Sequence, residues 1–325
     1  MLPCQGHSWK ETKRILEESL GPGYEDIFEF EDNAAHRKGL FKGWRLNSEL
    51  VRPIGSGCVA QVYKAKLRQN TSLHPSGTEV AIKVTHPHIL HKVCVDFYIL
   101  NKIVVLLEAI PRLNLNYLSM KDSVGQFRDI MLPQLDLRVE ARNLKRFRRD
   151  FADNPEVFFP LPVDGLTTSR VLVESFAHGE PLLKYMRNEH TTVEDRKELA
   201  IIGLETVMKM IFMNDFVHGD LHPGNILVDR RESGRGGGRL RMNMIDCGLV
   251  VEIGESDHVN LVKILGALIK KDGLLAGQLM ADTSKKCYGS KLDIEMFSNG
   301  IQKICKDDED NVSNLLCHNN SDGLN

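Results

Sequence analysis

The chain has 325 residues, of which 42% are hydrophobic and 26% are charged, so it is long enough for two lobes or domains and has the composition of a soluble globular protein. A formal net charge of −2 leaves no basic field, which excludes nucleic acid as an expected partner. The seven cysteines include no C-x-x-C pair, so a reducing compartment fits best, and neither a zinc site nor a disulfide framework is supported.

The N-terminal part predicts one short helix. Residues 8–20 have a helical apolar pattern, and Gly21-Pro22-Gly23 stops it. Residues 24–48 show no clear period and are predicted to be irregular. The first residues mix basic with acidic side chains, whereas a mitochondrial presequence is poor in acids, so no presequence is visible.

A β-like segment at 49–54 leads into a glycine-containing loop and then a strand. The sequence from Gly55 to Val62 fits the phosphate-covering loop G-x-G-x-x-G-x-V of kinases, with Ala60 in the third glycine place. The candidate nucleotide contacts are Gly55, Ser56, Gly57, Cys58, Val59, Ala60 and Val62. Glycines let the backbone approach phosphates closely. Alone the signal is weak, because a plain β-hairpin with a flexible tip explains it equally well.

A second strand at 79–84 adds weight to the loop. Its sequence Val80-Ala81-Ile82-Lys83 matches the kinase strand whose lysine holds the α- and β-phosphates. Taken alone, a lysine that ends an apolar strand most often faces solvent. The following pattern, 87–110, predicts a long helix closed by Pro111; its most apolar part is interrupted by polar and charged residues, so no transmembrane segment is expected.

A second helix is predicted to begin near Pro133. Its apolar stripe consists of Leu137, Leu144, Phe147 and Phe151, and Glu140 is the only charge on it. An unpaired buried carboxylate would cost several kcal/mol, so Glu140 needs a partner, and Lys83 is the natural one. The alternative is that Glu140 lies at the edge of the stripe and pairs with a neighbouring arginine.

The middle of the chain predicts strands at 158–162 and 170–175. The second of these is where a kinase hinge would lie, with its backbone groups, including those of Glu174, available to an adenine. Residues 193–213 predict a strong helix. Its expected core side consists of Ala200, Leu204, Val207 and Ile211.

Three expectations concern the remainder of the chain. Residues 232–239 are glycine-rich and predict a flexible hairpin tip and not a nucleotide motif. Residues 259–269 predict another helix. After Lys285 the patterns weaken, and 317–325 are predicted to be a frayed tail.

The strongest signal is the segment 217–228, with the sequence VHGDLHPGNILV. Asp220 and Asn225 have the spacing of the kinase catalytic loop H-x-D-L-x-x-x-N, and Asp246 follows in a D-x-G turn. One carboxylate must face the substrate hydroxyl, while an amide oxygen and a second carboxylate converge on Mg²⁺ beside the phosphates. Taken singly, His218, Asp220 and Asn225 would more often be ordinary turn residues, but their joint spacing makes coincidence improbable.

Taken together, these motifs resemble those of the UbiB/AarF-domain (ADCK-type) atypical kinases. The resemblance is carried by IGSGCVAQVYKA (54–65), VAIKV (80–84), QLDLRVEARNLKRF (134–147), FVHGDLHPGNILV (216–228) and IDCGLV (245–250). It implies that Lys83 and Glu140 form an ion pair, that Asp220 is the acidic residue of the catalytic loop, and that Asn225 and Asp246 bind the metal. It also implies a mitochondrial location and a link to coenzyme Q or lipid metabolism.

The sequence departs from that family in several places. The family's E-x-D motif falls on Gln134-Leu135-Asp136, so its first acid is missing, and the alanine-rich nucleotide loop is replaced by the glycine-containing one. No K-x-G-Q segment is visible, and no A-P-E sequence follows Asp246.

The expected fold is α+β and two-lobed, protein-kinase-like, with a small antiparallel-sheet lobe and a mainly helical lobe. The expected parts are an extension at 1–48, the small lobe with its helical insertion at 49–175, and the helical lobe at 176–325. The expected function is Mg²⁺-dependent ATP binding with phosphoryl transfer or ATP hydrolysis. Two alternatives stay open: a non-catalytic ATP-binding scaffold, and a small-molecule kinase of the choline or aminoglycoside type, against which the helical insertion between Lys83 and Glu140 argues.

Overall fold

The computed structural model describes residues 6–30, 51–110, 120–231, 238–284 and 289–319. The chain divides into two compact units, which are described separately. Unit 1 comprises Met1–Met208 and His218–Val251, and unit 2 comprises Lys209–Val217 and Glu252–Asn325. None of the described helices combines the length and the apolar composition that crossing a membrane requires.

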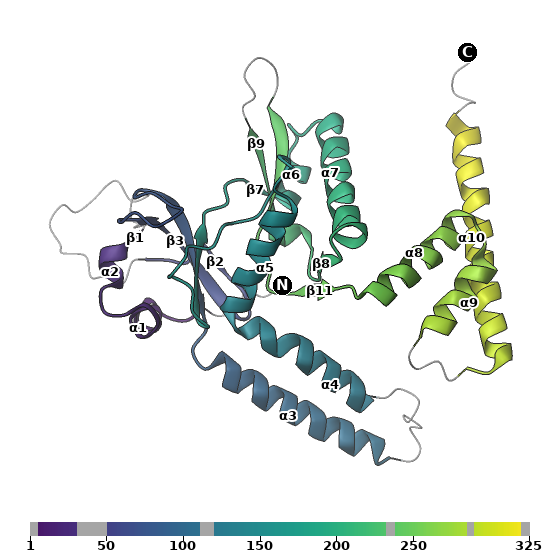
Figure 1. Ribbon diagram of the computed structural model, residues 1–325, viewed down its shortest axis with the longest axis horizontal. Helices are drawn as coiled ribbons and strands as arrows, with labels where there is room; N and C mark the ends of the chain where they lie inside the picture. The colour runs from purple at the N-terminus through teal and green to yellow at the C-terminus, as the bar shows by residue number, and fades with distance from the viewer. Residues whose placement is uncertain (1–5, 31–50, 111–119, 232–237, 285–288, 320–325) are drawn as a thin grey trace. The chain divides into compact units, whose positions relative to one another are not determined.

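An antiparallel sheet organises the N-terminal half of unit 1 (Figure 1). Its strands are β1 (Phe28–Phe30), β2 (Gly55–Ser56), β3 (Ala60–Leu67), β4 (Glu79–Thr85) and β6 (Val171–Ser175), in the order β1-β3-β4-β6 with β2 on β3. Ala81 lies directly opposite Glu174. Because side chains alternate along a strand and directly opposed residues share a face, Ala81, Lys83 and Glu174 lie on one face of the sheet.

The other face of the sheet carries the apolar core. Tyr63 and Ile82 are almost completely buried there with Ile15 and Leu16 of α1 (Trp9–Leu20). The helix expected at 8–20 is therefore confirmed, with Ser8 as its N-cap. The expectation of irregular structure at 24–48 is wrong for its first part, because α2 (Tyr24–Ile27) and β1 form there; the remainder lies outside the described residues.

The stretch 49–54 was expected to be β-like, but in its described part, 51–54, the chain forms no strand, and the first strand after it is β2. The backbone amide of Ile54 donates to Val62 O at 2.8 Å, so this stretch only leads into the β2–β3 pair.

Between β4 and β6 the chain forms a helical hairpin and the helix that carries Glu140. The elements are α3 (Ile89–Glu108), α4 (Met120–Met131), a 3-10 turn (Leu132–Leu135) and α5 (Leu137–Asp150). The first corresponds to the helix expected at 87–110, whereas α4 was not expected. The helix expected near Pro133 begins later, at Leu137, because the 3-10 turn comes first and the Asp136 side chain caps α5.

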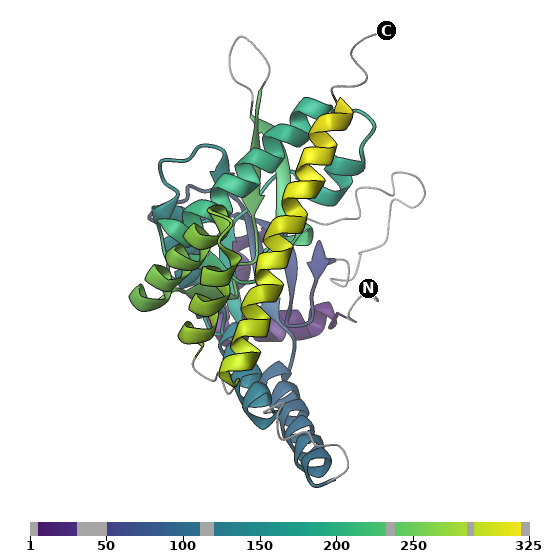
Figure 2. The ribbon, with the colours of Figure 1, turned by 90° about the vertical axis from the view of Figure 1, so that its right-hand side faces the viewer.

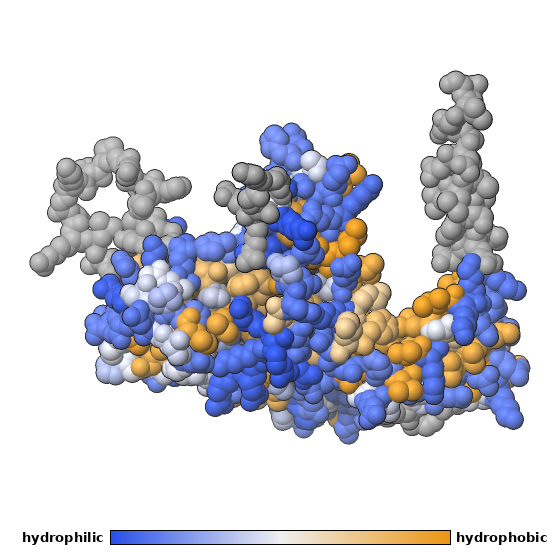
Figure 3. All heavy atoms as spheres, turned by 45° about the horizontal axis from the view of Figure 1, so that its top comes forward, coloured by the Kyte–Doolittle hydropathy of each residue, from blue (hydrophilic) through white to orange (hydrophobic). Residues whose placement is uncertain are grey.

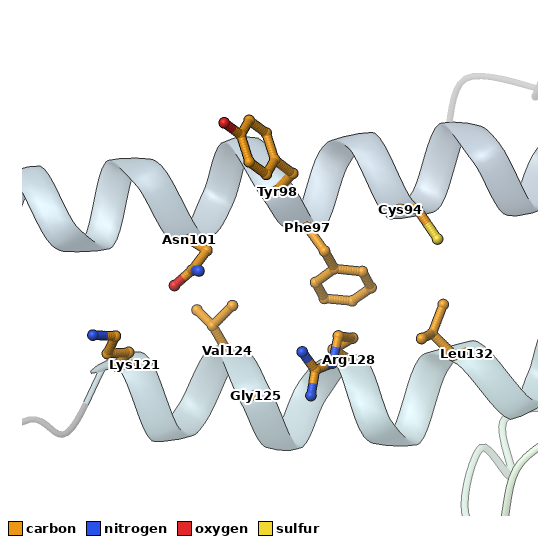
Figure 4. A pocket seen from close by; sticks show the side chains of 9 residues that line it. All are labelled: Cys94, Phe97, Tyr98, Asn101, Lys121, Val124, Gly125, Arg128 and Leu132. Atoms are coloured by element: carbon orange, nitrogen blue, oxygen red, sulfur yellow. The ribbon is translucent and has the colours of Figure 1, made fainter.

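The helices α3 and α4 run antiparallel, side by side (Figure 4). A groove of about 430 Å³ separates them, lined by Cys94, Phe97, Tyr98, Asn101, Lys121, Val124, Gly125, Arg128 and Leu132. Much of α3 is apolar and exposed: Tyr98 and Leu106 have 63% and 67% of their surface accessible. This groove contains none of the residues that the motifs single out.

A second sheet, in the order β5-β10-β9-β7, follows in unit 1. Its strands are β5 (Val157–Phe158), β7 (Glu180–Pro181), β9 (Ile226–Arg231) and β10 (Arg239–Met244). Only the β5–β10 pair is parallel. The glycine-rich tip expected at 232–239 falls mostly outside the described residues, between β9 and β10. Other short elements are α6 (Leu182–Arg187), β8 (Phe216–His218), a 3-10 turn (Pro223–Asn225) and β11 (Val250–Glu252); β8 and β11 each include a boundary between the two units.

The helix expected at 193–213 is α7 (Val193–Phe212), but its expected core side is wrong. Leu204 is 57% exposed and Ala200 is also exposed, whereas Leu199, Ile202 and Thr206 are buried. Apolar residues occur nearly all around this helix, so periodicity alone does not decide which side packs inward.

Unit 2 is helical. Its helices are α8 (Glu255–Ile269), α9 (Gly273–Thr283) and α10 (Lys291–Asn319), the last drawn in yellow in Figure 2. A Cβ atom at Gly273 would lie 2.5 Å from Gln302 Cα, and one at Gly277 would lie 2.6 Å from Ser298 Cα, so both glycines allow α9 and α10 to approach closely. Apolar side chains (orange) also reach the surface of this unit (Figure 3). Ile269, for example, is 82% exposed.

The helix expected at 259–269 is confirmed by α8. Although the sequence patterns weaken after Lys285, α10 follows and extends to Asn319, so the frayed tail expected at 317–325 is wrong for its first three residues. The position of α10 is set by contact with the small residues of α9, which a search for apolar periodicity does not detect. The last residues of the expected tail lie outside the described part of the chain.

Candidate functional site

One lysine joins three elements of unit 1. Lys83 Nζ, from β4, donates to both carboxylate oxygens of Glu140, from α5, at 2.9 and 2.8 Å. The same nitrogen lies 3.2 Å from Asp246 Oδ1. The side chains of Lys83 and Glu140 are only 14% and 4% exposed, whereas that of Asp246 is half exposed. The contact expected from the charge on the apolar stripe is thus present, and the alternative pairing of Glu140 with an arginine is not.

Helix α5 presents Glu140 because of how the helix begins and packs. The Asp136 side chain accepts a hydrogen bond from Arg138 N at 3.0 Å, which fixes the first turn. Leu137, Leu144 and Phe147 are buried on the same stripe as Glu140. The carboxylate is therefore directed inward by the packing of its neighbours, toward the face of the sheet that carries Lys83.

The ionisation of this cluster follows from burial and charge together. Burial disfavours the ammonium of Lys83, but Glu140 and Asp246 outweigh it and raise the pKa of Lys83 above its ordinary value. Burial likewise raises the pKa of Glu140, so its ionised form depends on Lys83. For Asp246 burial also opposes the charge, yet Lys83 holds the pKa of this carboxyl below its ordinary value.

The turn that carries Asp246 is fastened to α5. Asn143 Nδ2, one turn after Glu140, donates to Cys247 O at 2.8 Å, and both residues are buried. Asp246 itself has a positive φ of 65°, an uncommon conformation for a residue with a side chain. Sequence reasoning did not single out Asn143, although it stands in the EARN part of the helix that suggested the family resemblance.

Hydrogen bonds to backbone groups fix the conformation of the loop from His218 to Asn225. Asp220 N donates to His218 Nδ1 at 3.2 Å, and Asn225 Nδ2 donates to Asp220 O at 3.1 Å. Ile245 N donates to Asn225 O at 2.9 Å, which ties this loop to the turn with Asp246. The Asp220 side chain is 64% exposed, so its carboxylate is available to a reactant.

Gly219 lies where this loop closely approaches Leu249, the residue just before β11. Gly219 N donates to Leu249 O at 2.9 Å, and a Cβ atom at Gly219 would lie 2.8 Å from Leu249 Cγ. His218, beside it, is buried and stacks on Phe147 with ring centroids 6.2 Å apart. Burial lowers the pKa of His218, so the ring is a neutral support of the loop.

The donor set suits a magnesium ion. The bond from Asn225 Nδ2 to Asp220 O leaves the amide oxygen of Asn225 available, and Asp246 supplies a carboxylate. Mg²⁺ is usually bound by one or two protein oxygens together with substrate phosphates and water. Among the described residues, no group of three or more His, Cys, Asp or Glu side chains could hold a metal on its own.

The glycine-containing loop lies next to Lys83 in the sheet. Gly55 and Ser56 pair with Val62 and Gln61 of β3, and Val62 lies directly opposite Lys83. Gly57 N donates to Ala60 O at 2.9 Å, which closes a turn that includes Cys58 and Val59. The turn of the loop is therefore joined to β3, the strand that pairs with the one that carries Lys83.

Much of the backbone of 170–175 is already hydrogen-bonded within the protein, which argues against the expectation that it is free to contact an adenine. β6 is the last strand in the order β1-β3-β4-β6 and pairs with β4 on one side. On its other side Val173 O accepts from Val163 N, and Ser175 N donates to Leu161 O. Glu174 instead offers its side chain, on the face that carries Lys83; one of its carboxylate oxygens is buried without a partner, and burial together with Glu140 raises its pKa to about 8.

Comparison with known proteins gives a consistent result. Residues 46–279 match the ABC1 atypical kinase-like domain. A probable serine/threonine-protein kinase of Dictyostelium discoideum, abkC, is 35% identical over 227 residues, which cover 69% of this chain and 28% of that protein. A mitochondrial ABC1 family protein of Saccharomyces cerevisiae is 28% identical over 301 residues, which cover 78% and 45% of the two chains.

A probable protein kinase UbiB of Vibrio cholerae is 25% identical over 297 residues, which cover 91% of this chain and 48% of that protein. The chain thus spans less than half the length of these three relatives. A solved structure from Mycobacterium tuberculosis, the complex of Rv3197 with erythromycin, has a TM-score of 0.59 at 22% identity and covers 90% of this chain and 65% of that one. This likeness confirms the expected α+β, two-lobed kinase-like fold, and it supports the fold alone.

Proposed function

The chain belongs to the ABC1 atypical kinase-like family, which includes the UbiB kinases, and on that premise we propose that it binds ATP with Mg²⁺ and transfers or hydrolyses the terminal phosphoryl group. The observation that carries the proposal is the cluster of Lys83, Glu140 and Asp246. A kinase needs the lysine–glutamate pair and the metal-binding aspartate in place at the same time. Here a single buried ammonium contacts both carboxylates.

Each residue has a distinct part in this mechanism. Lys83, oriented by Glu140, binds the α- and β-phosphates, and the loop at 55–60 covers the phosphates and excludes water. Asn225 and Asp246 would hold Mg²⁺, which when bound neutralises charge on the phosphate oxygens. Asp220 accepts the proton of the attacking hydroxyl or orients a water molecule. Catalysis then consists of positioning and charge neutralisation.

The cellular setting belongs to the same proposal. The relative from Saccharomyces cerevisiae is named mitochondrial, and the family resemblance links such kinases to coenzyme Q or lipid metabolism. We therefore place this activity in mitochondria, with a lipid or a component of coenzyme Q biosynthesis as partner or phosphate acceptor. The acceptor is best sought by comparing ATP turnover with and without a lipid extract.

Replacing Asp246 with asparagine should abolish the part of nucleotide stabilisation that depends on Mg²⁺. A ligand present at 100 times its Kd stabilises the folded state by about 2.7 kcal/mol, which thermal unfolding detects readily. The wild type should show a shift with ATP and Mg²⁺ that EDTA reduces, and the D246N variant should show no difference between the two conditions. D129N, at an exposed aspartate on α4, is the matched control and should behave as wild type. A D246N shift as large and as Mg²⁺-dependent as that of the wild type would refute the metal assignment.

A further inference from the structure

His86, a residue outside the expected motifs, forms hydrogen bonds with the glycine-containing loop. His86 follows β4 directly and is 9% exposed. Its ring Nε2 lies 2.9 Å from Gly57 O, and its backbone amide donates to Val59 O at 2.8 Å. One residue therefore fixes two carbonyl groups of the loop, those of Gly57 and Val59.

The N-terminal segment supplies a partner for His86. His7 Nδ1 lies 2.8 Å from His86 Nδ1, with the two rings nearly perpendicular at 89°. His7 Nε2 lies 3.0 Å from Thr12 Oγ1, which in turn lies 2.7 Å from the hydroxyl of Tyr63. Thr12 and Tyr63 are 0% and 1% exposed, so this chain of hydrogen bonds ends in the core beneath the sheet.

With both imidazole rings neutral, the direction of each hydrogen bond in this path follows from elementary chemistry. A carbonyl oxygen can only accept, so His86 must carry its proton on Nε2. In a neutral His86 ring Nδ1 then accepts, and His7 must donate from its own Nδ1. His7 Nε2 consequently accepts from the hydroxyl of Thr12, and Thr12 accepts from that of Tyr63. This arrangement uses the single hydroxyl proton of Thr12 for His7 Nε2 at 3.0 Å, in preference to the longer contact of the same hydroxyl with Ser8 O at 3.4 Å.

The surroundings favour that proton arrangement. Burial lowers the pKa of His7 to about 4, and the neighbouring His86 acts in the same direction, while Glu11 opposes them. Burial also raises the pKa of Tyr63, so its hydroxyl keeps the proton that it donates. Gln61 Nε2 adds support by donating to His7 O at 3.1 Å and to Thr12 Oγ1 at 3.2 Å.

We propose that His86, with His7 as its partner, is a positioning residue for the phosphate-covering loop, and that the N-terminal segment is thereby part of the nucleotide site. This inference rests on the proposed nucleotide binding. A glycine-containing loop that is free must lose backbone entropy when it closes on phosphates. A loop already tied at Gly57 and Val59 has lost part of that freedom beforehand, so more of the binding energy appears as affinity.

The test compares ATP with adenosine, because only ATP has phosphates for the loop to cover. The H86F variant keeps an aromatic ring but removes both ring hydrogen bonds; H86Q keeps a donor near the position of Nε2. One net hydrogen bond corresponds to about fivefold in an equilibrium constant. We expect H86F to bind ATP about fivefold more weakly with unchanged adenosine affinity, and H86Q to recover at least half of the loss on a logarithmic scale. H91F, at an exposed histidine on α3, should match the wild type.

The partnership with His7 is tested by a double-mutant cycle. H7F should also weaken ATP binding, and H7F/H86F should be little worse than H86F alone, because both changes break one connected path. Fully additive effects would show that His7 does not act through His86. Equal losses for ATP and adenosine would show a general effect on folding and would overturn the positioning role, as would unchanged ATP affinity in H86F.

Hydrogen exchange separates this inference from the proposed function. In the nucleotide-free protein, amides 55–60 should exchange faster in H86F than in wild type or H91F. Unchanged exchange would reject the positioning role whether or not nucleotide binds. A wild-type protein that binds no ATP would instead refute the proposed function, and wild-type binding with unaltered H86F binding would refute this inference alone.

Discussion

Replacing Asp220 with alanine should lower ATP turnover at least about 100-fold while leaving ATP affinity nearly unchanged. A positioned general base or orienting carboxylate contributes about 10²–10⁴-fold to rate. The loop should survive the change, because Asn225 Nδ2 bonds to the backbone oxygen of Asp220, which alanine retains. Nucleotide affinity should depend instead on Lys83, on the loop at 55–60 and on the metal ligands.

Turnover and ATP affinity should be measured on the same preparation of D220A, with D257A, an exposed aspartate on α8, as the matched control. The scaffold alternative predicts little turnover in the wild type and partner binding that survives D220A. Robust turnover in the wild type with no change in D220A would remove Asp220 from the catalytic role.

Two parts of the site could be predicted from the sequence: the catalytic loop, whose residues are close together in the chain, and the pair of Lys83 with Glu140. Asp220 and Asn225 lie on one short loop, so their spacing alone brings the amide of Asn225 to the backbone of Asp220. The pairing of Lys83 with Glu140 is distant in sequence, yet a single charge on an apolar stripe required a partner and indicated which one. Such signals work because a buried charge without a partner is expensive.

The parts that the sequence did not reveal depend on neighbours that are remote in the chain. The short strand β1 exists because its residues pair with β3. Much of the backbone of 170–175 is occupied because β6 pairs with β4 and also bonds to Leu161 and Val163. Helix α7 has apolar residues on most sides, so only packing selects Ile202 over Leu204. The path from His7 to Gly57 joins separate segments through single polar atoms and leaves no periodic pattern.

Replacing Lys83 with methionine should lower the free energy of unfolding of unit 1 by about 3–5 kcal/mol. Removing one partner of a buried ion pair leaves the other charge uncompensated, which is far more harmful than losing both. Glu140 is almost completely buried, and Asp246 loses the same ammonium. The double variant K83M/E140Q should recover a large part of the loss, because a neutral amide is less costly to bury than a carboxylate.

Urea unfolding followed by tryptophan fluorescence can measure this, since Trp9 packs on Tyr63 with ring centroids 5.1 Å apart in the core of the sheet. The chain has two tryptophans, so a W44F background leaves Trp9 as the only reporter. The matched control is K145M on α5, because Lys145 also contacts a carboxylate, Asp164, at 2.6 Å.

Both members of the control pair are about half exposed, and exposed pairs of this kind contribute about 0–1 kcal/mol. The two lysine variants thus compare two ion pairs of similarly short distance, one buried and one exposed to solvent. A large decrease in the free energy of unfolding in K83M, with a small decrease in K145M, would show that the buried Lys83 is needed for the stability of the fold as well as for phosphate binding. Equal small losses would mean that Glu140 tolerates the absence of Lys83, and that a carboxylate at this buried position needs no cationic partner.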